Sequence, residues 1–344
     1  MIQFQCDYNE GAHPLILQHL AETNMEQTIG YGEDPYCTQA RELIKQACER
    51  EDIDVHFLVG GTQTNTTVIA HTLRPYQGVI SAMSGHINVH ETGAIEATGH
   101  KVLAVPSPNG KLTAAQIEGV VQAHLNEDGP EHMVQPGMVY ISFPTEVGTI
   151  YTRAEMEAIS TMCRKYGLPL FVDGARLGYG LCSPECDITL PQLAKWADVF
   201  YIGGTKVGAL FGEAVVITNE SLKRDFRYSI KRHGGMLAKG RLLGIQFATL
   251  FTDGLYMQIA QQAIDEAMRI KTALQDKGIA FLIDSPTNQQ FPIFCNAQLE
   301  ELNKTYLFSV WQQIDDTHTA VRICTSWATK HENVDRLIED IKQL

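Results

Sequence analysis

The sequence predicts an α/β protein, with a large domain built on a mostly parallel sheet and a smaller α+β domain behind it. Apolar segments that suit buried strands alternate with helical segments from residue 55 to residue 216. This alternation is typical of a parallel sheet covered by helices on both faces. Two of the apolar segments end in a charged side chain, Asp173 and Lys206. After about residue 279 the pattern changes to short strands followed by a closing helix.

Composition narrows the class of protein. The chain has 344 residues, of which 44% are hydrophobic, and this is enough for a large core and two domains. A formal net charge of −13 argues against a nucleic-acid partner. No apolar run of about 18 residues occurs, and the N-terminus lacks a signal sequence, so we expect no membrane span and a cytoplasmic location. The eight scattered cysteines suit free thiols, and we expect no metal site.

The predicted elements follow one another in a regular order. An amphipathic helix is expected from Thr38 to Glu51, on the spacing of its apolar residues. Short β-branched or aromatic runs predict the strands of the larger domain at residues 55–59, 78–82, 101–105, 138–143, 168–172, 199–202 and 212–217. Helices are expected at residues 66–73, 112–126 and 153–166, the last capped by Thr152.

The C-terminal part is expected to begin with a long helical region. This region covers residues 242–278, and Gly254 is a predicted break in it. Strands at 281–283, 291–294 and 320–324 and a helix at 331–344 complete the chain. We therefore predict three parts: an N-terminal arm (1–35), a large domain (36–250) and a small domain (251–344).

Lys206 stands out because it lies at the end of a predicted buried strand, after two glycines and a threonine. A surface lysine in a turn is the simpler interpretation, since an unpaired ammonium is costly to bury. A partly desolvated lysine, however, loses its proton more easily and becomes a nucleophile for carbonyl groups. Asp173 ends another strand 33 residues earlier (206 − 173), and ligands bind at the carboxyl ends of strands in open α/β sheets. A lysine and an acid in this arrangement suit pyridoxal phosphate.

A glycine turn between a strand and a helix predicts an anion site at Gly60-Gly61-Thr62. Free backbone N–H groups and the helix dipole favour a phosphate there. The alternative is a plain turn capped by Thr62 or Thr64. Together with Lys206 and Asp173, the turn is predicted to be a phosphate cup.

Several motifs occur in an order that resembles one enzyme family nearly from end to end. They occupy residues 7–8, 11–14, 30–32, 60–65, 85–96, 173–176 and 205–206. The chain resembles the threonine aldolase branch of the fold-type I pyridoxal phosphate enzymes, which is related to the β-eliminating lyases. This resemblance implies a seven-stranded sheet in the large domain and the cleavage of a β-hydroxy-α-amino acid, such as L-threonine or L-allo-threonine, to glycine and an aldehyde.

The resemblance also implies roles for individual residues. Lys206 would carry the cofactor's aldehyde and Asp173 would hold its ring nitrogen protonated, while His86 would stack on the ring. The remaining cofactor-binding residues would be Gly61, Thr62, Arg176 and Thr205.

The substrate carboxylate would be held by Arg176 and Arg322. The family usually has a serine where this chain has Cys6, and a thiol is a weaker hydrogen-bond donor. A base that removes the hydroxyl proton should have a pKa near neutrality, which favours histidine. His86, His132 and a bound water are the alternatives.

Two rival functions share this cofactor site. One is a β-eliminating lyase acting on another amino acid, and the other is a binding protein of the same fold without catalysis. The resemblance further implies a homodimer or homotetramer with shared active sites. The basic residues from Lys223 to Arg241 would then approach a neighbouring subunit's phosphate.

Overall fold

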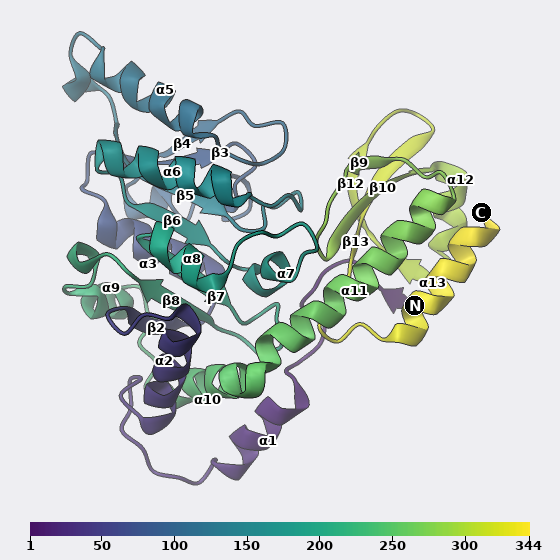
Figure 1. Cartoon of the computed structure of the whole chain (residues 1–344), viewed down its shortest axis with the longest axis horizontal. Helices are drawn as coiled ribbons and strands as arrows, with labels where there is room; N and C mark the ends of the chain where they lie inside the picture. Colours follow the sequence, from purple (N-terminus) through teal and green to yellow (C-terminus); the bar gives the residue numbers. More distant parts are fainter.

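Two sheets divide the chain into a larger and a smaller part in the computed structural model, which describes residues 1–344 (Figure 1). The larger sheet has seven strands in the order β2-β8-β7-β6-β5-β3-β4. Only β8 runs antiparallel to its neighbours, so the predicted mostly parallel sheet is confirmed. The strands are β2 (Asp54–Leu58), β3 (Gln77–Ala82), β4 (Val102–Val105), β5 (Gln135–Ser142), β6 (Leu170–Asp173), β7 (Val199–Gly203) and β8 (Glu213–Ile217).

Helices cover both faces of this sheet because successive strand residues point to opposite sides. In β7, Phe200 and Ile202 join one core, whereas Val199 and Tyr201 join the other. The first core also receives side chains from α2 (Pro35–Cys48), α5 (Ala114–Leu125), α6 (Arg153–Tyr166), α8 (Leu190–Trp196) and α10 (Arg241–Phe251). The second core is closed by α3 (Gly61–Thr72) and α9 (Phe226–Arg232). No helix combines the length and the apolar character needed to cross a bilayer.

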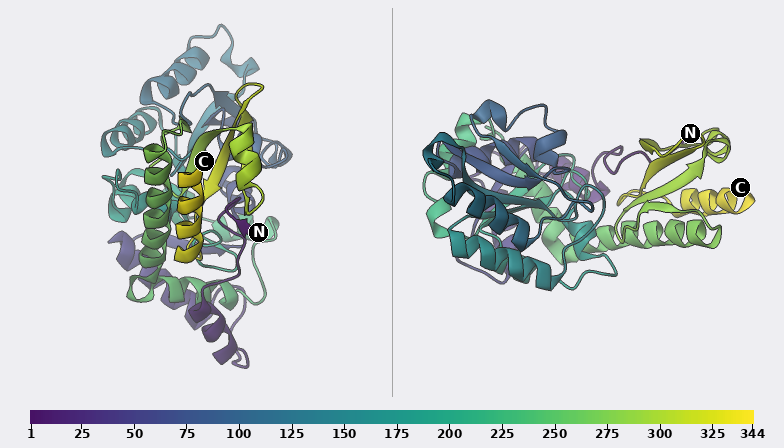
Figure 2. Two further views of the ribbon diagram at one scale, coloured as in Figure 1. Left: turned by 90° about the vertical axis from the view of Figure 1, so that its right-hand side faces the viewer. Right: turned by 90° about the horizontal axis from the view of Figure 1, so that it is seen from above.

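The smaller part is an antiparallel sheet with helices packed against it, as Figure 2 shows from two sides. Its strands, in sheet order, are β12 (Ser309–Gln313), β13 (His318–Cys324), β10 (Gln289–Cys295) and β9 (Phe281–Ile283). The helices are α11 (Leu255–Asp276), α12 (Asn296–Leu302) and α13 (His331–Gln343). The polar sequence of β12 explains why this strand was not predicted.

A helix break marks the passage between the two parts. Asp253 and Gly254 have φ values of 52° and 71°, in the left-handed region that ends a helix. The long green helix α11 then runs toward the smaller sheet (Figure 1). We propose this break as the domain boundary, close to residue 250 where the sequence suggested it.

The N-terminal arm belongs to both parts. Its first strand, β1 (Ile2–Gln3), pairs in parallel with β11 (Tyr306–Leu307) in the smaller part. Phe4 is buried there, with its ring 6.2 Å from that of Tyr306 and 6.5 Å from that of Phe308. The chain then crosses to the larger part, where α1 (Pro14–Glu22) contacts α10.

Because Phe4 is buried in the smaller part, we expect a substitution in the arm to change the stability of that part. Phe4→Ala should lower the free energy of unfolding of the smaller part by about 3–5 kcal/mol, because a buried ring is replaced by a cavity. Urea unfolding followed by tryptophan fluorescence measures the change. Gln3→Ala, at an exposed position of the same strand, should change the stability by less than about 0.5 kcal/mol. Equal effects of the two substitutions would show that the arm does not stabilise this part.

Candidate active site

A cavity of about 350 Å³ opens at the carboxyl ends of the parallel strands. The structure brings most of the predicted site residues to its wall. These residues are Gly61, Thr62, His86, Asp173, Arg176, Thr205 and Lys206. Tyr8 of the arm, Tyr201 of β7 and two carboxyl groups that were not predicted, Glu146 and Glu213, also line the cavity.

Asp173 lies at the end of β6 and is held by four donors. Its Oδ2 accepts hydrogen bonds from Tyr140 Oη at 2.6 Å and Asn65 Nδ2 at 3.2 Å. Its Oδ1 accepts from Tyr201 Oη at 2.5 Å and from the Ala175 N–H at 3.0 Å. Burial and the Asp173 charge raise the pKa values of both phenols well above their usual range, so the phenols remain donors. This surrounding stabilises an anionic carboxylate at a fixed position.

Lys206 follows β7 and its Nζ has no hydrogen-bond partner in the protein. Burial lowers the pKa of this amine, and the positive charge of Arg176 lowers it further. Asp7, Asp173 and Glu213 oppose the shift without cancelling it. A lysine that releases its proton more readily is the nucleophile that the sequence predicted.

The N-terminus of α3 presents unpaired backbone donors to the cavity. This helix begins at Gly61, and no side chain caps it. A Cβ on Gly61 would lie 3.1 Å from Tyr201 Oη, so a larger residue would crowd the turn. With Thr62 and Thr205 also on the cavity wall, this end suits a phosphate.

Glu213 faces the same end of the cavity from the first position of β8. Its Oε1 accepts from Thr205 Oγ1 at 2.9 Å and its Oε2 accepts from the Gly204 N–H at 3.2 Å. Burial raises the pKa of Glu213 to about 8, although Lys206 opposes this shift. The carboxyl group is therefore mostly uncharged near neutrality and repels an anion little. An acidic residue at the start of an apolar strand does not by itself indicate this role, so the sequence did not predict it.

His86 begins the short helix α4 (His86–Val89) and is oriented by a buried acid. The Nδ1 atom lies 2.7 Å from Glu91 Oε1, and the Glu91 side chain is fully buried. Asn65 donates to the same oxygen at 2.7 Å and so links Glu91 to Asp173. Burial alone would lower the pKa of His86, but the hydrogen bond to Glu91 and the nearby carboxylates raise it above its ordinary value.

Glu146 lies in the loop after β5, beside His86. Its Oε1 accepts from Ser142 Oγ at 2.6 Å and from the His86 backbone N–H at 2.9 Å. Burial, together with the charge of Asp173, raises the pKa of Glu146. Sequence reasoning missed this residue, because its contact with His86 spans 60 residues.

Arg176 has a partner within the protein that the sequence did not predict. Its Nε donates to Asp7 Oδ2 at 2.7 Å and its Nη2 donates to Asp7 Oδ1 at 3.0 Å. Asn288 also donates to Asp7, at 3.0 Å. Burial would raise the pKa of Asp7, but the charges of Arg176 and Lys206 hold it below its usual range. One bidentate face of Arg176 is thus occupied within the protein, while Nη1 makes no hydrogen bond and the residue lines the cavity.

Arg322 and Cys6 lie outside the cavity wall, where the arm meets the smaller part. Arg322 donates from Nη2 to the carbonyl of Gln5 at 2.8 Å and from Nη1 to Gln289 at 3.3 Å, and its Nε is buried without a partner. Cys6 Sγ donates to Asn9 Oδ1 at 3.0 Å.

The structure does not bring His132 to this site. The residue ends the short helix η2 (Pro130–His132), just before the first residue of β5, and it is exposed. The cavity lies beyond the last residue of β5, at the opposite edge of the sheet. Within one subunit His132 therefore lies apart from the other predicted site residues, and its role stays a prediction.

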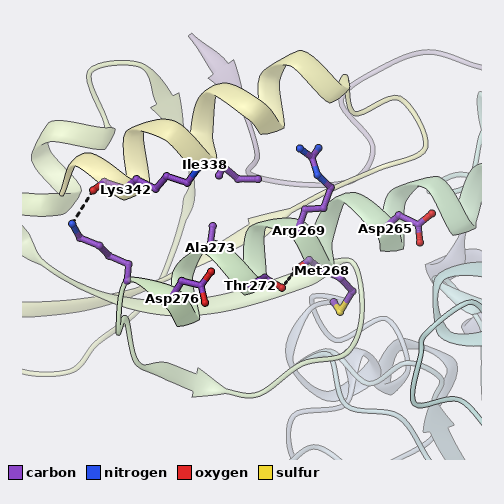
Figure 3. Close-up of a pocket in the computed structure, with 9 residues that line it drawn as sticks. Asp265, Met268, Arg269, Thr272, Ala273, Asp276, Ile338 and Lys342 are labelled. Atoms are coloured by element: carbon purple, nitrogen blue, oxygen red, sulfur yellow. Dashed lines mark hydrogen bonds between the residues drawn. The ribbon is translucent and has the colours of Figure 1, made fainter.

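A second hollow lies on the smaller part, between α11 and α13 (Figure 3). Its volume is about 760 Å³, and charged side chains that include Asp265, Arg269 and Lys277 line it. Lys277 donates to the carbonyl of Lys342 at 2.9 Å, across the two helices. None of the predicted site residues faces this hollow.

Comparison with known proteins identifies the family. Residues 8–297 match the β-eliminating lyase family. The chain belongs to this family. A low specificity L-threonine aldolase of Pseudomonas aeruginosa is 30% identical over 99% of this chain and 97% of its own length. A threonine aldolase structure from Leishmania major has 46% identity and a TM-score of 0.97, covering 100% of this chain and 99% of that one.

More distant structures share the fold alone. The histidinol-phosphate aminotransferase of Clostridium acetobutylicum has a TM-score of 0.74 at 12% identity, over 100% of this chain and 98% of the other. The predicted fold-type I architecture is thereby confirmed. Members of the β-eliminating lyase family use pyridoxal phosphate. The residues present fit this cofactor, since the cavity combines an activated lysine, a fixed carboxylate and an uncapped helix N-terminus.

The shifted pKa of Glu213 predicts a pH-dependent stability. Between about pH 4.5 and pH 8 the folded chain keeps a proton that the unfolded chain has released, so the free energy of unfolding falls as the pH rises. Glu213→Gln removes this dependence. Its melting temperature relative to the parent chain, measured without added cofactor, should therefore be higher at pH 8 than at pH 5. Glu157→Gln, an exposed control, should show the same difference at both pH values. An unchanged difference for Glu213→Gln would contradict the shift.

Proposed function

We propose that this chain is a pyridoxal phosphate-dependent aldolase that cleaves L-threonine and L-allo-threonine to glycine and acetaldehyde. The observation that carries the proposal is the near-complete match to threonine aldolases, together with a cavity that contains Lys206 and Asp173. The reaction is a carbon–carbon lyase reaction, in which the Cα–Cβ bond of the amino acid breaks.

Each cofactor-facing residue has a role that follows from its surroundings. Lys206 would hold the cofactor through its amine, and Asp173 would keep a positive charge on the ring nitrogen by its own fixed negative charge. When bound, the cofactor supplies an electron sink for the bond that breaks. The phosphate would be held by Thr205 and by the N–H groups at the start of α3, including those of Gly61 and Thr62.

We propose that the substrate carboxylate binds to the arginine side chains of the site. Arg176 keeps Nη1 for this contact while Asp7 fixes its orientation. Arg322 has an unpartnered buried Nε, and such a group is stabilised by an anionic partner. Cys6 would contribute a weak donor in place of the usual serine hydroxyl.

A β-eliminating lyase is the second candidate, because the family takes its name from that activity. The two reactions differ in their products. Elimination releases ammonia and a keto acid, whereas aldol cleavage releases glycine and an aldehyde. The activated Lys206 speaks against a protein of this fold that only binds.

Pairing of subunits is proposed from the exposed apolar side chains of the arm. Met25 is 88% exposed, Ile29 71% and Tyr228, on α9, 77%. Exposed apolar groups of this size are typical of interaction surfaces. We propose a homodimer, or a homotetramer formed from two dimers, that works in the cytoplasm.

The function is tested by incubating the holoenzyme with L-threonine and L-allo-threonine. Acetaldehyde, measured with alcohol dehydrogenase and NADH, should appear in equal amount to glycine. Lys206→Ala should abolish turnover, because no other lysine lines the cavity. Borohydride reduction and peptide mapping should mark Lys206 in the parent chain. A label on another lysine would refute the assignment, and formation of a keto acid and ammonia would favour elimination.

Arg322→Gln should raise KM for the amino acid with little change in cofactor affinity. Loss of a charge-assisted contact to the carboxylate costs about 1.5–3 kcal/mol, which corresponds to roughly 10- to 150-fold in KM. Cofactor affinity is measured by titrating the apoenzyme. If cofactor affinity fell while KM stayed constant, Arg322 would have a structural role instead.

Dilution of the holoenzyme tests whether its subunits share their active sites. If subunits complete one another's cofactor sites, activity and bound cofactor should be lost together at concentrations where sedimentation shows dissociation. A fully active monomer with bound cofactor would disprove the sharing of sites.

A further inference from the structure

The aldol cleavage proposed above needs a group that takes the proton of the substrate's β-hydroxyl. Such a base must be unprotonated at the working pH and must have a free acceptor atom facing the cavity. The carboxyl groups around the cavity differ strongly in this respect.

Most acceptors in the cavity are already committed. Asp173 accepts two hydrogen bonds at each oxygen, and Glu213 accepts one at each, at the end assigned to the phosphate. Glu91 does not line the cavity. His86 binds the buried Glu91 through Nδ1, so its Nε2 is the rival acceptor, because a carboxylate at Nδ1 raises the basicity of the other ring nitrogen.

Glu146 is different because only one of its oxygens is committed. Ser142 and the His86 backbone N–H both donate to Oε1 and fix the carboxyl group. The Oε2 atom accepts no hydrogen bond from another residue and is not sealed from solvent, and Glu146 lines the cavity. The side chain therefore presents one free, oriented acceptor beside His86 and Asp173.

We propose that Glu146 is the general base of this site and takes the β-hydroxyl proton of the substrate through Oε2. The proposal rests on the aldolase function above. Burial raises the pKa of Glu146, and a raised pKa makes its carboxylate a stronger base.

The cleavage conserves electrons and protons. The hydroxyl O–H bond breaks, its proton joins Oε2, and its electron pair forms the second C–O bond of the aldehyde. The Cα–Cβ bond breaks, and its electron pair stays with the glycyl half. That half takes up one proton at Cα, while Glu146 releases its proton to water, so no net proton is consumed. In the synthetic direction Glu146 returns the proton to the new hydroxyl.

The ionisation of Glu146 is set by groups on several elements around it. These groups are His86 on α4, Tyr140 on β5, Tyr151 before α6, Asp173 on β6 and Arg176 before α7. The pH profiles of the parent chain and of the Glu146 variants are therefore compared, since these proteins keep all of these groups.

The experiment separates carbon–carbon cleavage from a reaction that needs no hydroxyl base. Exchange of the glycine α-proton in D₂O, followed by NMR, requires the cofactor site but not a β-hydroxyl. The holoenzyme variants Glu146→Gln, Glu146→Asp and His86→Phe are compared, with Glu157→Gln on the exposed face of α6 as the matched control.

Glu146→Gln should lower kcat for threonine cleavage by about 10²- to 10⁴-fold and keep glycine exchange within about threefold. We expect the cleavage rate of the parent chain to rise with pH on the acid side, and this rise should disappear in Glu146→Gln. Glu146→Asp, which keeps the carboxylate, should recover part of the rate. His86→Phe should slow both reactions alike, and Glu157→Gln should change neither.

Three results would overturn the proposal. Cleavage within about tenfold of the parent in Glu146→Gln would remove Glu146 from proton transfer. Equal loss of cleavage and exchange in that variant would make it a structural residue. Selective loss of cleavage in His86→Phe would assign the base to His86. If the parent chain exchanged glycine but cleaved no β-hydroxy amino acid, the aldolase function itself would fail.

Discussion

A buried ion pair between Asp7 and Arg176 holds the three parts of this protein around one cavity. Asp7 comes from the arm and Arg176 from the large domain, and Asn288 of the smaller part donates to the same carboxylate. Removing one partner of such a pair leaves an uncompensated buried charge, which typically costs about 3–5 kcal/mol. The arm's Tyr8 reaches the cavity wall directly after this anchor. The ion pair that positions the arm is therefore also one of the charged contacts of the site.

The same chemical group has different states in this cavity because its surroundings differ. Asp173 is surrounded by four donors that favour the anion. Burial is the largest influence on the pKa values of Glu213 and Glu146, and it raises both, so these carboxyl groups keep their protons to a higher pH. Lys206 shifts in the opposite direction for the same reason, since low polarity disfavours any charge. One pocket thus combines a carboxyl group held by four donors with two carboxyl groups whose pKa values are raised by burial.

The sequence was informative where a local pattern and the sheet geometry agree. Lys206 and Asp173 each end an apolar strand, and parallel strands place such ends at one edge. The turn at Gly61 was visible because a strand, a glycine and a helix start follow one another. These patterns predicted Lys206, Asp173 and the glycine turn of the cavity wall, and the mostly parallel character of the larger sheet.

Long-range pairing explains what the sequence did not reveal. Arg176 looked free to bind a carboxylate, yet its partner Asp7 lies 169 residues away. Glu146 follows an ordinary strand, and its orientation depends on a backbone N–H from another loop. His132 lies before β5 and the cavity lies beyond the other end of that strand, a separation that the resemblance did not reveal. Strands as short as β1 and β11 carry no periodic pattern at all.

The pairing of β1 with β11 determines the order in which parts of the chain can fold during synthesis. The first strand leaves the ribosome about 300 residues before its partner Tyr306–Leu307 exists. Contacts of such high sequence separation form late, because a long loop must be closed first. Asn288, the third member of the Asp7 cluster, is also made near the end. A growing chain therefore exposes Lys206 without its finished surroundings, and the cavity matures only when the last domain has folded onto the first residues.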